Sequence, residues 1–340
     1  MNFLWLFMLV ASTSWALAGL LRRYALAKSL MDVPNERSSH SVPTPRGGGV
    51  SIVVTFLTGL LYLLGSALLD ARAFIALFVA GLVVAIIGFV DDHEHIAARW
   101  RLMGHFVASG WIVFWLGGLP SLNLFGITID LGLTGYVLAI VALVWLLNLY
   151  NFMDGIDGLA AIEALSSSLL AGFIFFFLFD NQELFYLHLL MAAAVVGFLI
   201  WNLPPAKIFM GDAGSGFLGM VLGAIALYSA HIEANMLWVW LILLGVFITD
   251  ATHTLFRRLL RGDKIYQAHR SHAYQYASRK YESHLLVTSS VMFINLLWLA
   301  PWSVAVALGA VDGVLGLICA YAPLLWLAWY FKAGEFERRS

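Results

Sequence analysis

The chain has 340 residues, of which 61% are hydrophobic and 11% are charged, and its formal net charge is -1. A soluble globular domain is typically about half apolar and a quarter charged, so this composition excludes that class. The near-neutral charge identifies no partner, and the single cysteine, Cys319, excludes an intramolecular disulfide.

Eleven apolar runs approach the roughly 20 residues that a membrane-spanning helix requires. We therefore predict an all-α bundle of about eleven transmembrane helices that forms a single integral membrane domain, 1–340. The first run is long, has no positive charge before it and is followed by Arg22 and Arg23, so we interpret it as a span rather than a cleaved signal peptide. The predicted spans lie near 2–21, 47–69, 73–90, 102–119, 133–150, 159–179, 184–201, 213–230, 235–255, 285–308 and 311–331.

The positions of Lys and Arg predict the orientation of these spans. If Arg22 and Arg23 are cytoplasmic, all but one of the 19 Lys and Arg residues fall in inner segments, and the exception is Arg72. This places the N-terminus outside and the C-terminus in the cytoplasm, with ten or twelve spans as the rival counts. Between two spans, the segment Ser121–Leu131 alternates weakly around Gly126 and predicts a small outer hairpin.

Two acidic segments follow the third and fifth spans. Asp91 and Asp92 repel each other at a membrane boundary, and a divalent cation would offset that repulsion; the alternative is a pair of helix-capping residues in water. Asp154 and Asp157 lie three residues apart in a compact turn, for which the alternative is simple N-capping by Asp157. Polar or flexible neighbours of this turn are Asn148, Asn151, Gly155 and Gly158.

A third acidic segment precedes the eighth span, where glycines surround Asp212 at the start of a helix. Such a backbone favours phosphate groups. Phe209 is a candidate for stacking on a base, with packing at the membrane interface as its alternative. Further on, the segment 269–272 supplies His and Arg side chains that can bind a diphosphate. Other basic residues nearby fit the positive-inside rule better; they are Arg257, Arg258, Arg261 and Lys264.

Five aspartates thus fall on one predicted side of the membrane, which indicates a metal-dependent reaction on a polyanion. The rival class is a membrane transporter or lipid flippase, which would need charges near the bilayer midplane. In the middles of the predicted spans only Glu163 and Asp250 are carboxylates, and both lie within about two turns of an inner end.

In these motifs the sequence resembles the polyprenyl-phosphate N-acetylhexosamine-1-phosphate transferases, which include the phospho-MurNAc-pentapeptide translocase and the GlcNAc-1-phosphate transferases of O-antigen synthesis. The resemblance implies ten or eleven helices, Mg²⁺ or Mn²⁺, a UDP-N-acetylhexosamine donor, undecaprenyl phosphate as acceptor and release of UMP. It also implies a bacterial inner-membrane enzyme with a cytoplasmic active site. The matching segments are Asp32 to Arg37 with His40, Pro43 to Gly48, Asp91 with Asp92, Asn151 to Gly158, Asn202 to Ser215, and His269 to His272.

By position, the resemblance implies that Asp212 is the principal metal ligand, with Asp92 as a second ligand and Asp91 as the candidate base. The implied catalytic residues are Asp91, Asp92, Asp154, Asp157, His269 and His272. The implied substrate-binding residues are Arg46, Asn151, Gly155, Asn202, Phe209 and Arg270, and the uridine contacts are Asp157, Gly155, Asn202 and Phe209.

The sequence departs from the translocase pattern at two places. Ser41-Val42 stands where a Lys precedes the Thr-Pro motif, and His93-Glu94-His95 follows the Asp pair without a Lys. The short form of the 268–272 segment is closer to members that initiate O-antigen or lipopolysaccharide synthesis, some of which use 6-deoxy donors such as UDP-FucNAc or UDP-QuiNAc. The sequence does not choose among these sugars and GlcNAc.

Several alternatives stay open at this point. Asp154 to Ala161 fits part of a CDP-alcohol phosphotransferase motif, and Met210-Gly211-Asp212 fits part of an intramembrane protease motif, but each lacks its remaining residues. A double displacement through Asp91 is the alternative to direct transfer. The expected partners include membrane lipids and no nucleic acid, and a homodimer stays open.

Overall fold

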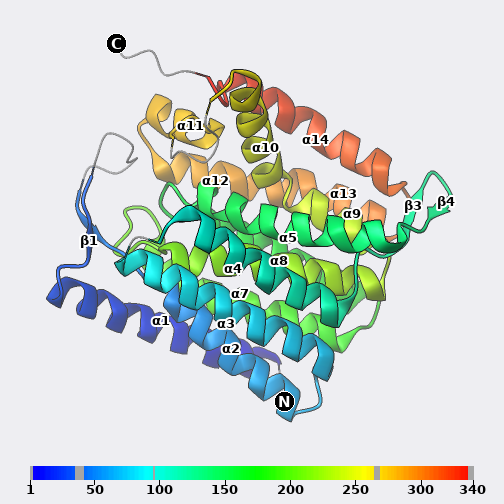
Figure 1. The fold of residues 1–340 in the computed structure, drawn as a ribbon, viewed down its shortest axis with the longest axis horizontal. Helices are drawn as coiled ribbons and strands as arrows, with labels where there is room; N and C mark the ends of the chain where they lie inside the picture. The colour runs from blue at the N-terminus through cyan, green and yellow to red at the C-terminus, as the bar shows by residue number, and fades with distance from the viewer. Residues whose placement is uncertain (1–2, 35–41, 95, 264–268, 336–340) are drawn as a thin grey trace.

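The computed structural model describes residues 3–34, 42–94, 96–263 and 269–335 of the chain. Long helices lie side by side in a bundle (Figure 1). Its first part contains α1 (Phe3–Ala27), α2 (Val50–Gly65), α3 (Ala71–His93), α4 (Ala98–Leu116), α5 (Gly132–Met153), α6 (Leu159–Leu178), α7 (Gln182–Asn202) and α8 (Asp212–Ile232). The second part contains α9 (Met236–Leu243), α10 (Gly245–Leu260), α11 (Ala273–Tyr281), α12 (His284–Ile294), the π-helical turn η1 (Asn295–Leu299), α13 (Ala300–Ala307) and α14 (Gly313–Tyr330).

Two short antiparallel strand pairs lie at opposite ends of the bundle (Figure 1). At one end, β1 (Met31–Asp32) pairs with β2 (Thr44–Pro45); this end, which also carries α11, is termed the inner end. At the other end, β3 (Leu122–Leu124) pairs with β4 (Ile127–Ile129). The hairpin predicted around Gly126 is therefore confirmed, and both of its turn residues have the positive φ that a tight hairpin requires.

Every predicted span falls on helical residues, although the span 235–255 is divided between α9 and α10, and this confirms an all-α, multi-pass membrane protein. In the described part of the chain, eight helices are long and apolar enough to cross a membrane, or nine if α9 and α10, bent by 69°, form one span. α2 has only 16 residues, fewer than the predicted span 47–69. It begins after Gly48 and Gly49, which donate their backbone N–H groups to the loop before α8, and it ends at Gly65. The count of eleven and the orientation of the termini stay predictions.

Of the span of α8, 94% is buried, against 22% of α1 and 28% of α14. α8 therefore runs through the centre of the bundle. At its start the backbone of α3 comes very close. A Cβ added at Gly88 would lie 2.6 Å from the backbone nitrogen of Ala213, so only glycine permits this approach. The contact brings the inner end of α3, with Asp91 and Asp92, against Asp212.

At the opposite end of the bundle, which carries β3 and β4 and is termed the outer end, single polar side chains fix the starts of helices. Asp70, Asn181 and Asp312 each accept a hydrogen bond at 2.8–2.9 Å from a backbone N–H of the first turn of α3, α7 and α14. N-capping of this kind satisfies amides that have no partner within the helix. These scattered outer groups are therefore structural, in contrast to the clustered carboxylates of the inner end.

Candidate active site

Five aspartates from three separate segments meet at the inner end. Asp91 and Asp92 close α3, Asp154 and Asp157 lie between α5 and α6, and Asp212 begins α8. The carboxyl groups of Asp91 and Asp212 are in contact. The Asp154 carboxyl group is close enough to Asp92, Asp157 and Asp212 for their charges to act on it. We term these five residues the acidic cluster. The structure thus brings together the carboxylates that the sequence predicted to converge.

Asp92 holds the start of α8. Its side chain is 3% exposed, Arg46 Nη2 lies 2.7 Å from its Oδ1, and its two oxygens accept hydrogen bonds from the backbone N–H groups of Asp212 (3.0 Å) and Ala213 (3.2 Å). From the sequence, this helix N-terminus was expected to bind a phosphate. For the N–H groups of Asp212 and Ala213 that expectation is wrong, because both donate to Asp92. A helix N-terminus attracts any nearby anion, and here the anion is the Asp92 carboxylate.

Gly211 makes room for this arrangement. Its φ is +79°, a conformation that favours glycine, and a Cβ there would lie 2.7 Å from Asp92 Oδ2. The alternative in which Asp91 and Asp92 are capping residues in water is also wrong, since their side chains are only 5% and 3% exposed and both are ion-paired.

Arg101 is a site residue that the sequence analysis counted only as part of the basic inner face. Its Nη1 pairs with Asp91 Oδ2 and lies 3.5 Å from Asp212 Oδ2, while the backbone N–H of Ile96 donates to Asp91 Oδ1 at 2.9 Å. Asp212 stays 34% exposed, so it is the accessible carboxylate of the pair. The sequence offered one sign of this role: Arg101 follows Asp91 by ten residues and directly precedes the next predicted span, 102–119.

Asp154 has no hydrogen-bond donor against its carboxylate among the described residues. Burial raises the pKa of Asp154 well above its usual range, and the negative charges of Asp212, Asp92 and Asp157 raise it further. The cluster therefore holds more negative charge than Arg46 and Arg101 can neutralise. Such crowding is relieved by a divalent cation, whose charge dominates its surroundings.

The acidic cluster is not a complete metal cage. In the described residues, no group of three or more His, Cys, Asp or Glu side chains is close enough to hold a metal ion. Mg²⁺, however, is commonly bound by one or two carboxylates together with substrate phosphates and water. Asp212 and Asp154 fit that sparse type of site, whereas Asp92, the other predicted ligand, is engaged by Arg46 and two backbone amides.

Asn202 and Asp157 brace two loops of the site. Asn202 is 3% exposed, its Oδ1 accepts from the Gly158 N–H and its Nδ2 donates to the Ile208 carbonyl, both at 3.0 Å. Asp157 Oδ2 accepts from the Ala206 N–H at 2.9 Å. The alternative in which Asp157 caps α6 is wrong, since Gly158 is the N-cap and has no side chain to bond. The amide of Asn202 is thus used within the protein, and its contact with uridine stays a prediction.

Other predicted substrate-binding residues lie nearby with different surroundings. A Cβ at Gly155 would lie 2.1 Å from Tyr274 Oη, so any larger residue here would displace the Tyr274 hydroxyl. Asn151 is half-buried at the end of α5 and makes no side-chain hydrogen bond to the described residues. The residues 35–37 and His40 of the first motif, His95 and Lys264 lie outside the described residues.

The segment 269–272 divides into an inward and an outward part. His272 is 1% exposed, and its Nδ1 lies 3.2 Å from Oδ1 of Asp250. Asp250 also accepts from the backbone N–H groups of Ala273 (2.9 Å) and Tyr274 (3.0 Å), so it caps α11. His269 stacks on His272 with 4.9 Å between ring centroids and is half-buried, as is Arg270. His269 and Arg270 are therefore more accessible to a substrate than His272 is.

A cleft of about 820 Å³ adjoins the acidic cluster and is termed the polar cleft. One wall contains Asp157 and Phe209, which are three residues from Asp154 and Asp212 respectively. The other wall contains Arg279 and His284, from the junction of α11 and α12. Phe209 therefore lies where an aromatic ring can meet a ligand next to the carboxylates.

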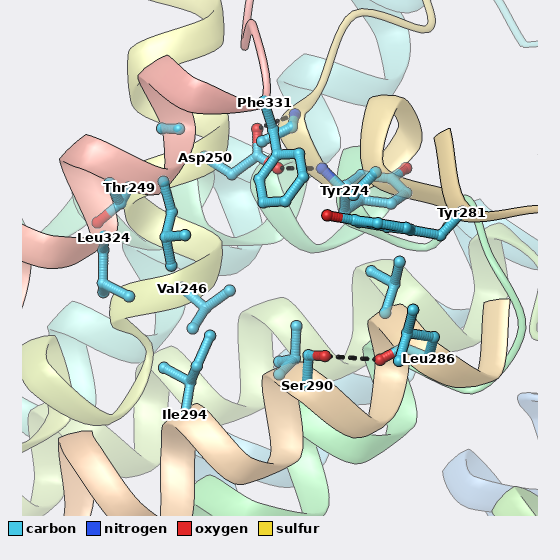
Figure 2. Close-up of a pocket in the computed structure, with 16 residues that line it drawn as sticks. Val246, Thr249, Asp250, Tyr274, Tyr281, Leu286, Ser290, Ile294, Leu324 and Phe331 are labelled. Atoms are coloured by element: carbon cyan, nitrogen blue, oxygen red, sulfur yellow. Dashed lines mark hydrogen bonds between the residues drawn. The ribbon is translucent and has the colours of Figure 1, made fainter. Parts of the chain in front are cut away.

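A second cavity of about 500 Å³, termed the apolar pocket, lies between α10, α11, α12 and α14. Figure 2 shows side chains from these four helices pointing toward a common space, with Asp250 and Tyr274 on its side nearest α11. Tyr274 also donates its hydroxyl to the Phe152 carbonyl at 2.9 Å, two residues before Asp154. The labelled apolar lining residues are Val246, Leu286, Ile294, Leu324 and Phe331.

Residues 74–230 match the sequence family described as glycosyl transferase family 4. This stretch contains all five residues of the acidic cluster, together with Arg101, Asn202 and Phe209.

Three bacterial relatives illustrate the similarity. A probable undecaprenyl-phosphate N-acetylglucosaminyl 1-phosphate transferase of Bacillus subtilis is 28% identical, over 74% of this chain and 71% of the relative. A phospho-N-acetylmuramoyl-pentapeptide-transferase of Streptococcus thermophilus is 31% identical, over 66% and 68%. A decaprenyl-phosphate N-acetylglucosaminephosphotransferase of Mycobacterium leprae is 29% identical, over 58% of this chain but only 54% of the relative.

Proposed function

Because this chain belongs to glycosyl transferase family 4, we propose that it transfers an N-acetylhexosamine-1-phosphate from a UDP-sugar to a polyprenyl phosphate and releases UMP. One observation carries the proposal: an acidic cluster at the inner end of a membrane bundle lies beside both a polar cleft and an apolar pocket. The two cavities suit a water-soluble donor and a lipid acceptor.

The polar cleft has the size of a small-molecule site, for which volumes of roughly 300–1,000 Å³ are usual. At about 820 Å³ it has room for a nucleotide, with Phe209 available to stack on a base and Asp157 to accept hydrogen bonds. The apolar pocket suits part of an isoprenoid chain, because burying such a chain removes apolar surface from water. Tyr274 links this pocket to the loop that carries Asp154.

In the proposed reaction, an oxygen of the polyprenyl phosphate attacks the β-phosphorus of the UDP-sugar. The bond from that phosphorus to the oxygen bridging the α-phosphorus breaks, and UMP leaves with the electron pair. Both reacting phosphates are already ionised near neutral pH, so the step depends on neutralising charge rather than on a strong base. Mg²⁺ (or Mn²⁺), held by Asp212 and Asp154 with the phosphates, would supply that neutralisation.

The surroundings of Asp91 favour direct transfer over a phosphoenzyme. Its carboxylate is 5% exposed, one oxygen accepts from the Ile96 N–H and the other pairs with Arg101. A nucleophile needs a free oxygen facing the substrate, and Asp212 has the more accessible carboxylate. In this proposal Asp91 therefore orients Arg101 rather than accepting the phosphosugar.

Two finer parts of the proposal concern location and sugar. We propose that the inner end faces the cytoplasm of a bacterial inner membrane, where the sequence concentrates Lys and Arg. The sugar is an N-acetylhexosamine, with GlcNAc and 6-deoxy sugars such as FucNAc or QuiNAc as the candidates. The product would begin an O-antigen, lipopolysaccharide or related surface glycan.

UMP release by the purified protein tests this function. The assay combines undecaprenyl phosphate, Mg²⁺ or EDTA, and a panel of UDP-N-acetylhexosamines. We expect UMP only when lipid, metal and one suitable donor are present. Asp212→Asn keeps the size of the side chain but removes its charge, and we expect at least a roughly 10³-fold loss of rate, because it removes a ligand of the cation that would stabilise the reacting phosphates.

Asp180→Asn is the matched control. Asp180 follows α6 at the outer end with a φ of +47°, a conformation that Asn adopts readily, so its rate should equal that of the unaltered protein. Lipid movement without UMP release from any donor would overturn the transferase proposal and favour a flippase. Equal rates for Asp212→Asn and the unaltered protein would remove Asp212 from the proposed site.

A further inference from the structure

The wall of the polar cleft that faces Asp157 and Phe209 comes from the junction of α11 and α12, which no sequence motif includes. His284, the first residue of α12, lines this wall and has a side chain that is 19% exposed. Its Nδ1 lies 3.2 Å from Oδ1 of Asp157, whose own side chain is 12% exposed. The imidazole therefore meets the carboxylate at the surface of the cleft.

Asp157 is held from three sides. Its Oδ2 accepts from the Ala206 N–H at 2.9 Å, and its carbonyl accepts from Thr288 Oγ1 at 2.8 Å, one turn further along α12. His284 Nδ1 lies 3.2 Å from its Oδ1 and accepts from its backbone N–H at 3.5 Å. Each carboxylate oxygen has more than one lone pair, so Asp157 can still accept from a ligand. Of these contacts, only that of His284 joins the carboxylate to the part of the cleft lining that comes from α11 and α12.

We propose that His284 is a positioning residue for the donor: it holds the Asp157 carboxylate toward the polar cleft, and the start of α12 forms the second wall of a nucleoside site. The inference rests on the proposed function. When the donor's diphosphate lies at the acidic cluster, its nucleoside is next to this cleft, because Asp157 and Phe209 are on the same loops as Asp154 and Asp212.

The chemistry of the cleft selects the nucleoside half of the donor. Phe209 offers an aromatic face for a base, and Asp157 offers acceptor oxygens for a ribose hydroxyl or a base N–H. In the apolar pocket the one carboxylate, Asp250, already accepts backbone N–H groups of α11 with both of its oxygens. His284 acts through Asp157 and needs no contact with the reacting phosphates.

Binding of UMP, measured by calorimetry without turnover, tests the inference alongside steady-state kinetics. For His284→Ala we expect the Kd for UMP and the KM for the UDP-sugar to rise about tenfold, the effect of losing one polar contact that holds a charged group in place. The kcat and the KM for polyprenyl phosphate should change less than about threefold. His284→Gln keeps an amide that can accept from the Asp157 N–H and donate to the Asp157 carboxylate, and it should recover most of the affinity.

The control is His231→Ala, which removes a histidine hydrogen bond to the Gly118 carbonyl at the far end of α8 and should leave UMP binding unchanged. If His284→Ala binds UMP as the unaltered protein does, or if both KM values rise together without recovery in His284→Gln, the inference is overturned. That result would leave the proposed function standing. UMP binding that depends on His284 in a protein that turns over no UDP-sugar would support the nucleoside site and overturn the proposed function.

Discussion

The polar cleft and the apolar pocket are built in part from the same two helices. On α11, Tyr274 and Ala277 line the apolar pocket, whereas Ser278 and Arg279 line the polar cleft. On α12 the first turn faces the cleft and the later turns, from Leu286 on, face the pocket. Neighbouring residues of a helix point in different directions, so one thin element can separate two environments of opposite polarity.

This arrangement explains how a donor rich in charge and an acceptor rich in methyl groups can reach one set of carboxylates. The cleft meets the acidic cluster through the residues that follow Asp154 and precede Asp212. The pocket meets it through Tyr274, whose hydroxyl bonds the Phe152 carbonyl. Variants that change the cluster, the pocket or the shared helix should therefore have three different kinetic signatures.

Among variants of the cluster's partners, the pocket and the shared helix, the largest effect is expected for Arg101→Gln, which leaves the repulsion between Asp91 and Asp212 uncompensated. We expect kcat to fall about 10²-fold, as for the loss of one electrostatic group at a reacting centre, with smaller changes in either KM. Arg101→Lys should keep part of the rate because it keeps the charge. UMP release at saturating concentrations of both substrates measures this.

Arg99→Gln is the control for Arg101. It removes an arginine from the same first turn of α4, where the guanidinium lies over the Trp100 ring instead of a carboxylate. A fall in kcat of the same size in both variants would show that the basic helix end as a whole matters, and would contradict a specific role for Arg101.

A smaller and one-sided effect is expected in the apolar pocket. Ser290 lines this pocket on α12 and is exposed, so Ser290→Phe fills space without overpacking the core (Figure 2). We expect the KM for a long polyprenyl phosphate to rise about tenfold, and the KM for the UDP-sugar to stay within about twofold. Kinetics with each substrate varied in turn, and with a short-chain acceptor that needs less of the pocket, measure this.

Ser290→Ala separates the loss of the hydroxyl from the added bulk, because Ser290 Oγ donates only to the Leu286 carbonyl of its own helix. It should behave like the unaltered protein. An increase in the KM for the UDP-sugar as large as that for the lipid would mean that the two cavities are not independent.

The apolar pocket also marks the limit of what the sequence could predict. Spans, the hairpin and the three acidic segments were predictable, because hydrophobicity and motif composition are local properties. The pocket needs side chains from α10, α11, α12 and α14 together, and no local pattern contains that information. The same holds for Asp92, whose partners Asp212 and Ala213 lie about 120 residues away in the chain.

Asp250 is an intermediate case. A carboxylate inside an apolar span must have partners, so the sequence indicated that it had a role without giving one. The structure assigns it the first turn of α11 and His272, 22 residues away in the chain. The motif 269–272 was thus recognisable in the sequence. The inward direction of the His272 side chain depends on Asp250, which the motif does not contain.

The smallest of these effects, and the one that bears on both cavities, is expected for Asp250→Asn. Both oxygens of Asp250 accept backbone N–H groups of α11, so an amide at this position turns a donor toward a donor. We expect a loss of about 1–2 kcal/mol in stability, seen as a lower thermal unfolding temperature. Both KM values should rise roughly threefold, because α11 borders both cavities.

Asp70→Asn is the matched control, since Asp70 caps α3 through Oδ1 alone and Asn is an equally good N-cap. It should change neither the unfolding temperature nor the kinetics. If Asp250→Asn raised only the KM for the lipid, α11 would serve the acceptor alone, and the cleft wall would depend on α12. A rise in both values, with kcat nearly unchanged, is the result that a shared partition between two substrates requires.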